Sequence, residues 1–454
     1  MIRTSVLTAL WWCLLACDQA TPEPSPVWAP GTVYPSLPAA NARGLLDLRG
    51  LIHAHSPYSH DACDGEPLID GLPDPVCMED LRRGLCQVQH DFAMFTDHDD
   101  SGSDTDFIDL LLHEPDRGDV LVSRDGDPIA SWAACPEPGK ATLIMAGMEA
   151  SLMPVGLERH TDRRFDRQPT AEAVEVFKEA GAVVLLQHTE DWTVDQMVDL
   201  GVDGFEMFNL HANTVQGANQ VLEMLFRVTE GRPGLPHPDL FIVPWISEDP
   251  RYLERWSQVL ARGVRRVGTM GTDCHRNTFE ALLEDGERGD SYRRMMVSFS
   301  NHLLVRPEGD GSWDDRHLKE ALRAGRLYGV FELLGYAEGF DFVGQGETLA
   351  EMGDEVRLGD GVTLSVTQPR VRHLDQGVEP PALRTRLLRA TEAGWVEVAA
   401  GPGDLRVEVT EPGAYRAEVR MQPRHLRRAL GDYDQRAIEG DMVWIYANPI
   451  YVRR

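Results

Sequence analysis

Lysine is scarce in this chain of 454 residues, and positively charged residues are fewer than negatively charged ones. The three lysines are Lys140, Lys178 and Lys319, so arginine carries almost all of the positive charge. The 73 acidic residues outnumber the 44 lysines and arginines, which gives a formal net charge of -29. Such a charge repels polyanions and argues against non-specific binding of nucleic acid.

The N-terminus has no apolar run long enough to span a bilayer. The run over residues 6–15 falls short of the roughly 20 residues that a transmembrane helix needs, and it is typical of an export signal. Leu14-Leu15-Ala16-Cys17 resembles the lipobox of bacterial lipoproteins. This implies a signal peptide over 1–17 and a lipid anchor on Cys17, which would hold the protein on a bacterial membrane, facing the periplasm or the cell exterior. An ordinary signal peptide with an incidental cysteine is the alternative, and inner and outer membrane both stay open.

Proline-rich residues without periodicity follow the signal, and we predict a disordered tether over 18–45. Apart from Cys13 and Cys17, the chain has few cysteines. They are Cys63, Cys77, Cys86, Cys135 and Cys274. In an oxidising compartment the first four can form two disulfides, whose pairing the sequence does not reveal, and Cys274 is expected to be a small buried residue.

The chain also lacks a Gly-x-Ser-x-Gly motif and any arrangement of serine, histidine and acid that indicates a protein nucleophile. What it does have is alternation of apolar runs with helix-like segments. Strands are predicted at 48–55, 92–98, 142–151, 182–188, 204–209, 240–246, 264–273 and 301–305. Helices are predicted at 76–88, 170–180, 193–200, 214–229, 250–262 and 315–324.

This alternation predicts βα units and a parallel sheet closed into a barrel over 46–339. The insert over 99–140, rich in aspartate and glycine, is expected to have little regular structure. Residues 340–454 contain short runs, most of them with a period of two, separated by turn sequences such as Glu-Pro-Gly. They predict a second domain, an antiparallel β-sandwich.

Most of the strand-like runs in the first domain end in ionisable residues. The residues are His53, His55, His98, Glu149, His188, Asp273 and His275. Residues i and i+2 of a strand point to the same face, and strand ends of a βα barrel open on one face, so these side chains are expected to meet. Burying them together is costly unless metal ions compensate their charge. Mixed histidine and carboxylate ligands suit zinc, manganese or iron, and their number favours two or three ions with Glu149 as a bridge.

Five separated motifs carry a resemblance to a known family. They are His53-Ala-His55-Ser-Pro-Tyr-Ser59, Thr96-Asp97-His98, Gly147-Met-Glu149, His188 and Asp273-Cys-His275. In this order and spacing they resemble the PHP (polymerase and histidinol phosphatase) family of metallohydrolases. The resemblance implies a distorted seven-stranded βα barrel and hydrolysis of phosphate esters. It also implies a trinuclear metal centre built from the seven ionisable residues named above. The sandwich is similar to that of a PHP branch with carbamate (carbaryl) hydrolases.

Two further ligand positions follow from the family pattern. His60 and Asp61 both lie where a ligand follows the first histidine pair, and Asp61 is favoured. His160 lies where a histidine commonly follows the glutamate, although a surface loop residue fits as well. Asp97 is expected to orient a ligand. The histidines treated as structural or solvated are His90, His113, His211, His237, His302, His317, His373 and His425.

Together these features predict a metal-dependent hydrolase, a phosphoesterase acting on a small phosphoester through a metal-activated water. Arg276 and Arg159 are candidates for binding an anionic substrate group. Hydrolysis of a carbamate, ester or amide is the first alternative, although no lysine ends a strand where a carboxylated lysine would bridge metals. A surface binding protein with a structural metal site is the second. The oligomeric state stays open.

Overall fold

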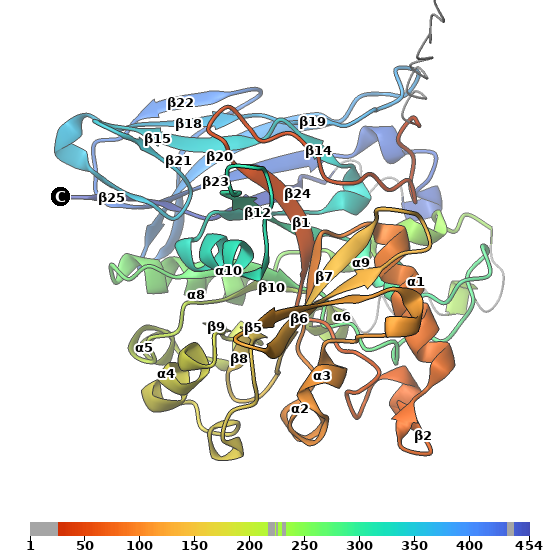
Figure 1. Ribbon diagram of the computed structural model, residues 1–454. Helices are drawn as coiled ribbons and strands as arrows, with labels where there is room; N and C mark the ends of the chain where they lie inside the picture. The colour runs from red at the N-terminus through yellow and green to blue at the C-terminus, as the bar shows by residue number, and fades with distance from the viewer. Residues whose placement is uncertain (1–25, 217–222, 224–225, 229–232, 434–439) are drawn as a thin grey trace, which may run out of the picture.

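A computed structural model describes residues 26–216, 223, 226–228, 233–433 and 440–454 (Figure 1). The predicted signal peptide with Cys17, the first residues of the predicted tether and much of the helix predicted over 214–229 lie outside these residues. The described chain is mixed α/β, and 17 of its strands belong to one large sheet.

Apart from the hairpin described below, the N-terminal part of this sheet contains nine strands among the described residues. They are β1 (Leu46–Ile52), β4 (Phe92–Phe95), β7 (Ala141–Gly147), β8 (Met153–Leu157), β9 (Val183–Leu185), β10 (Gly204–Asn209), β11 (Val267–Gly271), β12 (Ser300–Val305) and β13 (Leu327–Val330). Every strand predicted for this part, except the one over 240–246, corresponds to one of these. The strands β8 and β13 are not among those predicted.

Strand β1 lies at the centre of the N-terminal part, where it pairs in parallel with β4 and β11 and antiparallel with β12. The parallel pairing continues from β4 to β7 and from β11 to β10, whereas β7, β8 and β9 pair antiparallel. Backbone bonds also connect β9 to β10, since Glu206 N donates to Leu186 O at 2.9 Å and Leu186 N donates to Gly204 O at 3.1 Å. The seven-stranded βα barrel therefore stays a prediction.

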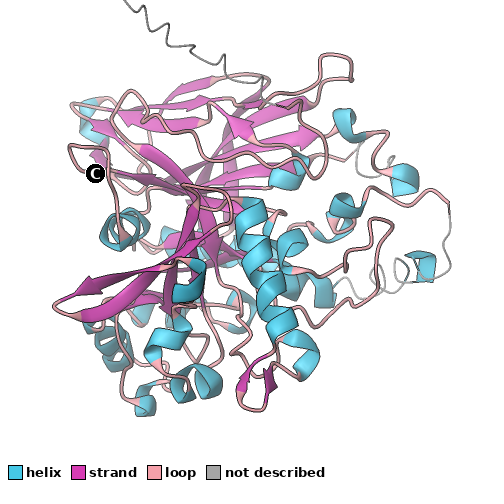
Figure 2. Ribbon diagram, turned by 45° about the vertical axis from the view of Figure 1, so that its right-hand side comes forward, coloured by secondary structure: helices cyan, strands magenta, loops and turns pink. Residues whose placement is uncertain are grey.

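Helices gather around the N-terminal part of the sheet, whereas the C-terminal part consists mainly of strands (Figure 2). The helices are α1 (Pro75–Val88), α2 (Asp99–Asp104), α3 (Phe107–Leu110), α4 (Ala171–Glu179), α5 (Val194–Asp199), α6 (Leu210–Gln216), α8 (Pro250–Ala261), α9 (Tyr292–Met296) and α10 (Asp315–Ala324). Their ends follow local chemistry. The Asp314 side chain caps α10 by accepting from Arg316 N, and Gly325 ends it with a φ of 78°.

Two regions differ from the predictions. The apolar run 240–246 forms two short 3-10 turns, η5 (Pro238–Leu240) and η6 (Val243–Trp245), because it is buried core that proline keeps out of a sheet ladder. The insert 99–140 is more regular than expected. It contains α2, α3 and a hairpin of β5 (Val120–Arg124) and β6 (Asp127–Ala134), which joins the sheet through β7.

The C-terminal part contains short strands, including one at each predicted run. They are β14 (Ala337–Glu338), β15 (Asp341–Gln345), β16 (Leu349–Ala350), β17 (Glu355–Arg357), β18 (Thr363–Thr367), β19 (Arg370–Val371), β20 (Ala382–Thr391), β21 (Gly394–Gly401), β22 (Leu405–Glu408), β23 (Gly413–Gln422), β24 (Met442–Ala447) and β25 (Ile450–Arg453). β16, β15, β18 and β22 form a separate four-stranded sheet. β20, β21, β23 and β24 continue the large sheet, because β24 pairs antiparallel with β13.

Residues 26–45 pack against the C-terminal part, which differs from the disordered tether predicted over 18–45. Trp28 and Tyr34 are buried in the largest core cluster, and Trp28 N donates to His373 O at 2.9 Å. Arg43 pairs with Asp341 and Glu351. The apolar and aromatic side chains among the prolines explain why this segment is ordered.

The four cysteines between residues 63 and 135 form two disulfides, Cys63–Cys77 and Cys86–Cys135, and Cys274 is buried as a free thiol. The first disulfide fixes the loop after β1, which also carries the short hairpin of β2 (Leu68–Ile69) and β3 (Leu72–Pro73). Among the described residues, no helix has the length and apolar character needed to cross a bilayer.

Candidate metal centre

The predicted ligands follow the ends of β1, β4, β7, β9 and β11, and backbone contacts past these ends bring them together. Glu149 N donates to Thr96 O at 3.1 Å, and Asp273 N donates to His53 O at 3.0 Å. His55 N donates to Cys274 O at 3.0 Å. The polypeptide of neighbouring strands therefore stays adjacent where the ionisable side chains begin.

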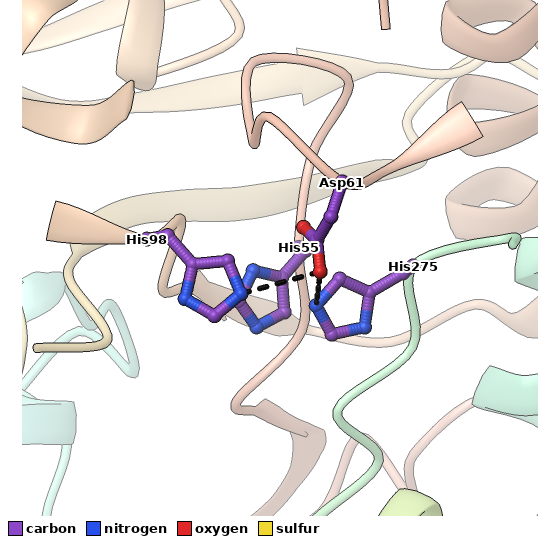
Figure 3. Close-up of side chains that lie close together, drawn as sticks. All are labelled: His55, Asp61, His98 and His275. Carbon is purple, nitrogen blue, oxygen red and sulfur yellow. Dashed lines mark hydrogen bonds and ion pairs between the residues drawn. The ribbon is translucent and has the colours of Figure 1, made fainter. Parts of the chain in front are cut away.

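One group of possible ligand atoms lies around Asp61 (Figure 3). Asp61 Oδ2 is 3.3 Å from Nε2 of both His98 and His275, and His55 completes the group. Ligand atoms of the four residues all lie within 4.8 Å of one another. The neighbouring His60 instead has its Nδ1 2.9 Å from Asp100 and is exposed, so the structure brings Asp61 and not His60 to this group.

A second group lies deeper and consists of His53, His55, Glu149 and Asp273, all buried. His55 Nε2 lies 3.1 Å from Glu149 Oε2 and 3.3 Å from Asp273 Oδ1. His53 Nε2 lies 3.4 Å from the same Asp273 oxygen. The second carboxylate oxygens of Glu149 and Asp273 face His188. The Nε2 atom of His188 is 3.1 Å from Glu149 Oε1 and 3.5 Å from Asp273 Oδ2. Glu149 therefore contacts different histidines through its two oxygens.

Three of these residues have left-handed backbone conformations, with φ of 67° at His53, 47° at His188 and 52° at Asp273. Positive φ is uncommon outside glycine, although histidine and aspartate adopt it more readily than most residues. Such conformations cost free energy and persist only where the surrounding structure holds them in place. They concentrate at functional sites. Here they turn the chain at three strand ends so that the side chains face a common space.

Several atoms that face this space have no hydrogen-bond partner. They are His53 Nε2, His55 Nε2, Asp273 Oδ1 and His275 Nε2, all buried. The opposite ring nitrogens do have partners, since His55 Nδ1 lies 3.0 Å from Ser59 Oγ and His275 Nδ1 lies 2.9 Å from Asp273 O. A metal-ligating histidine uses its second nitrogen in this way, which fixes the tautomer. These residues therefore fit a site for divalent cations.

Opposing pKa shifts link the carboxylates and the histidines of the cluster. Burial raises the pKa of the carboxyl groups of Glu149 and Asp273, but contacts with His53 and other histidines outweigh it and hold both pKa values well below the usual range. Burial lowers the pKa of His188, yet hydrogen bonds with Glu149 and Glu190 raise it to about 11. Burial, together with the nearby His55, lowers the pKa of His275 to about 3. Cations at the centre would supply the charge that these carboxylates need.

Three predicted site residues do not join the cluster. The ring of His160 is exposed, and its Nε2 lies 2.9 Å from Thr105 O. Arg159 is exposed and donates to Glu179 O at 2.7 Å. Arg276, with a φ of 56°, turns away from His275, so that its Nε donates to Asp80 Oδ2 at 3.1 Å. It lines a cavity of about 730 Å³ whose lining includes none of the predicted ligands.

The residue predicted to orient a ligand, Asp97, is buried and holds the backbone after His55. It accepts from Ser56 N at 2.6 Å and from Ser56 Oγ at 2.7 Å. Strand β10 and helix α6 also contribute to the site, which the sequence did not indicate. Glu206 contacts His53, and the ring of His211 lies 5.6 Å from that of His275, centroid to centroid. A glutamate within the otherwise apolar run of β10 is the signal that could have shown this.

The sequence matches no family model and no curated protein. Among solved structures, the chain is similar to the crystal structure of PsfC from Pseudomonas syringae PB-5123, with 14% identity and a TM-score of 0.31. That similarity covers 61% of this chain and 88% of PsfC. A TM-score this low supports no argument about fold or function, so the PHP family stays a resemblance that rests on the five motifs.

Proposed function

We propose that this protein is a metal-dependent hydrolase, a phosphoesterase that cleaves a small phosphoester at a centre of two or three divalent transition ions. The observation that carries the proposal is the convergence of five strand ends on two overlapping groups of ligand atoms. The ring nitrogens of His53, His55 and His275 that lack a hydrogen-bond partner support the presence of cations. The PHP resemblance supplies the phosphoester class.

The two groups suggest how ions would be held. One ion would use Asp61, His98 and His275, and another would use His53, Glu149 and Asp273. His55 belongs to both groups but faces them with a single nitrogen, so the two positions must be close together. His188 with the outer oxygens of Glu149 and Asp273 offers a third, less complete position. The donor set suits zinc, manganese or iron.

Ions bound there would make water a nucleophile at neutral pH and stabilise the substrate oxyanion. Access from solvent supports catalysis over a closed structural site. The side chains of His98, His188 and Asp61 are 27%, 30% and 34% exposed, although the rest of the cluster is buried. A structural site is closed by protein ligands on all sides, whereas a catalytic site keeps an open position. The surface binding protein is therefore the weaker alternative.

A carbamate, ester or amide hydrolase on the same centre is the other alternative. The lysines argue against one version of it, in which a carboxylated lysine bridges two metals. All three lie in the described chain and have other contacts: Lys140 pairs with Glu137, Lys178 donates to Gly201 O, and buried Lys319 pairs with Glu158 and Asp315. Glu149 is therefore the residue that would bridge two metals.

The experiment is a substrate panel on purified protein, stripped of metal and then reloaded with Mn²⁺ or Zn²⁺. It includes p-nitrophenyl phosphate, bis-p-nitrophenyl phosphate, nucleotides, aryl carbamates and aryl esters. We expect turnover of a phosphoester that is lost in His53→Ala and kept in His60→Ala, whose exposed side chain faces Asp100. Turnover of carbamates alone would support the alternative, and an inert metal-loaded protein would refute the enzyme proposal.

We also propose that the protein is exported and lipid-anchored through Cys17. The two disulfides support an oxidising compartment, because such bonds persist outside the reducing cytosol. Labelling cells with a radioactive fatty acid tests the anchor. Wild-type protein is expected to take up label and Cys17→Ser is not, and unlabelled wild-type protein would contradict the anchor.

A further inference from the structure

Strand β10 places one carboxylate behind the candidate metal centre. Glu206 is completely buried, and its Oε1 lies 2.5 Å from Nδ1 of His53. The other ring nitrogen of His53, Nε2, faces Glu149 and Asp273 and has no hydrogen-bond partner. If Nδ1 holds the proton and donates it to Glu206, then Nε2 has its lone pair directed at the centre.

The second oxygen of Glu206 reaches two more parts of the site. His188 N donates to Oε2 at 3.2 Å, at the residue whose φ is 47°. Asn209 Nδ2 also donates to Oε2, at 3.1 Å, and the same amide lies 3.3 Å from Asp273 Oδ2. The buried carboxylate of Glu206 thus contacts a ring nitrogen of His53 and the backbone of His188. Through Asn209 it also reaches the carboxylate of Asp273.

Gly271 gives independent evidence that the protein keeps room for this contact. A Cβ atom at residue 271 would lie 1.9 Å from Glu206 Oε1 and 3.1 Å from His53 Nδ1. Residue 271 ends β11 and is not among the glycines with positive φ, so turn geometry does not explain the glycine. Close approach of the Glu206–His53 pair explains it.

We propose that Glu206 is a positioning residue of the metal centre, which orients His53 through Nδ1, fixes the backbone at His188 and aligns Asp273 through Asn209. The proposal rests on the proposed function, since it assumes that these residues hold cations. Carboxylate partners of this kind raise the basicity of a ligating imidazole and fix its orientation, and their loss typically weakens metal affinity about 10- to 100-fold. Glu206 itself need not touch a metal or the substrate.

The test measures binding of Co²⁺, whose visible absorption reports ligand geometry, to metal-free wild-type protein and to Glu206→Gln by competition with a chelator. We expect affinity about 10- to 100-fold weaker and a changed absorption spectrum, because the amide is a poorer acceptor and can turn its NH2 group toward Nδ1. Asp47→Asn is the matched control. It changes a carboxylate 2.9 Å from Nδ1 of His302, away from the centre, and should alter neither quantity.

Wild-type affinity and spectrum in Glu206→Gln would overturn the inference and leave the proposed function intact. A wild-type protein that binds no Co²⁺ would instead refute the proposed function. Circular dichroism of the metal-free variant checks folding. Should Glu206→Gln not fold, Asn209→Ala takes its place, because it removes the link between Glu206 and Asp273 without changing either carboxylate. Weaker binding with a changed spectrum is expected there too, and unchanged binding would overturn the inference.

Discussion

Each histidine in the buried part of the centre uses its two ring nitrogens for different purposes. One nitrogen contacts a protein partner, such as Glu206 for His53 or Ser59 for His55, and the other faces the shared space. This division of roles orients each imidazole so that one nitrogen is available to a metal. His302, away from the centre, has carboxylates near both ring nitrogens, with Nδ1 2.9 Å from Asp47 and Nε2 3.5 Å from Glu332.

Asp61 and His60 are adjacent in sequence but differ in what they contact. Substitutions at the two positions are therefore expected to differ in their effect on metal binding. Asp61→Asn is expected to lose the ion shared with His98 and His275, weakening its binding by more than the roughly 100-fold that an outer-shell change causes. His60→Asn should retain the wild-type metal content. Elemental analysis after dialysis provides the measurement. The opposite result, with metal lost only from His60→Asn, would contradict this assignment.

His302 gives a prediction about stability and pH. Burial lowers its pKa, but Asp47 and Glu332 raise it to about 9, and Tyr328 stacks on the ring. Because the folded pKa is raised, its contribution is complete below pH 6.5 and is lost as the pH rises toward 9. The loss is about 3 kcal/mol at most. Urea unfolding of metal-free protein at several pH values should show this decline, and it should be smaller in His302→Gln. Equal declines would contradict the prediction.

Sequence alone indicates which residues gather when they lie just past strand ends, as His98 and Glu149 do. It does not indicate how a side chain turns after that point. Arg276 follows His275 directly, yet its left-handed backbone directs it to Asp80. Glu206 was missed for the converse reason, because it lies inside a strand and not past its end.

At the scale of elements, disulfides fix the loops on either side of α1. Cys63–Cys77 closes a separation of 14 residues just after Asp61 in the chain, and Cys86–Cys135 closes a separation of 49 residues. Removing either bond should destabilise the protein by about 2–4 kcal/mol, with the longer loop costing about 1 kcal/mol more.

The two disulfides are expected to differ in their effect on metal binding. Replacing Cys63 and Cys77 by serine frees the loop that carries Asp61, and metal affinity should fall. Replacing Cys86 and Cys135 should lower stability alone. Denaturant unfolding and chelator competition on the two double variants measure both quantities. A loss of metal affinity confined to the Cys86 and Cys135 variant would contradict this account.

Element types were predicted well where the sequence carried local signals. The helix α10 begins after Asp314 and ends before Gly325, as its capping residues indicate. The hairpin of β5 and β6 has Asp125-Gly126 between its strands, a two-residue turn with positive φ at both positions and a strong local signal for a hairpin. The strand predicted over 240–246 was wrong, because an apolar composition indicates burial but does not distinguish a strand from other buried structure.

At the scale of the whole molecule, the C-terminal part supports the strand that leads to the metal centre. Asn448 is completely buried, and its side chain accepts from Gly268 N and donates to Gly268 O, both at 2.8 Å. Gly268 lies on β11, which ends two residues before Asp273. Together with the pairing of β13 and β24, this contact joins the two predicted domains through one sheet. Sequence patterns within each part could not reveal such pairing, because it depends on contacts between distant segments.

Asn448→Ala tests this connection. The variant leaves two buried backbone groups of Gly268 without partners, each at a cost of about 1–3 kcal/mol. Thermal unfolding is expected to shift to a lower temperature and to remain a single transition. Asn448→Ala protein with wild-type stability, or with two separate transitions, would show that the two parts are not coupled through this contact.

The central claim is that side chains from five strand ends hold a cluster of divalent transition ions. Anomalous scattering from crystals grown with Zn²⁺ or Mn²⁺, recorded at the absorption edge of the metal, tests it most directly. The account predicts at least two peaks about 2.0–2.2 Å from ligand atoms, one beside Asp61, His98 and His275 and one beside His53, Glu149 and Asp273. Crystals with no anomalous peak among these residues would contradict it.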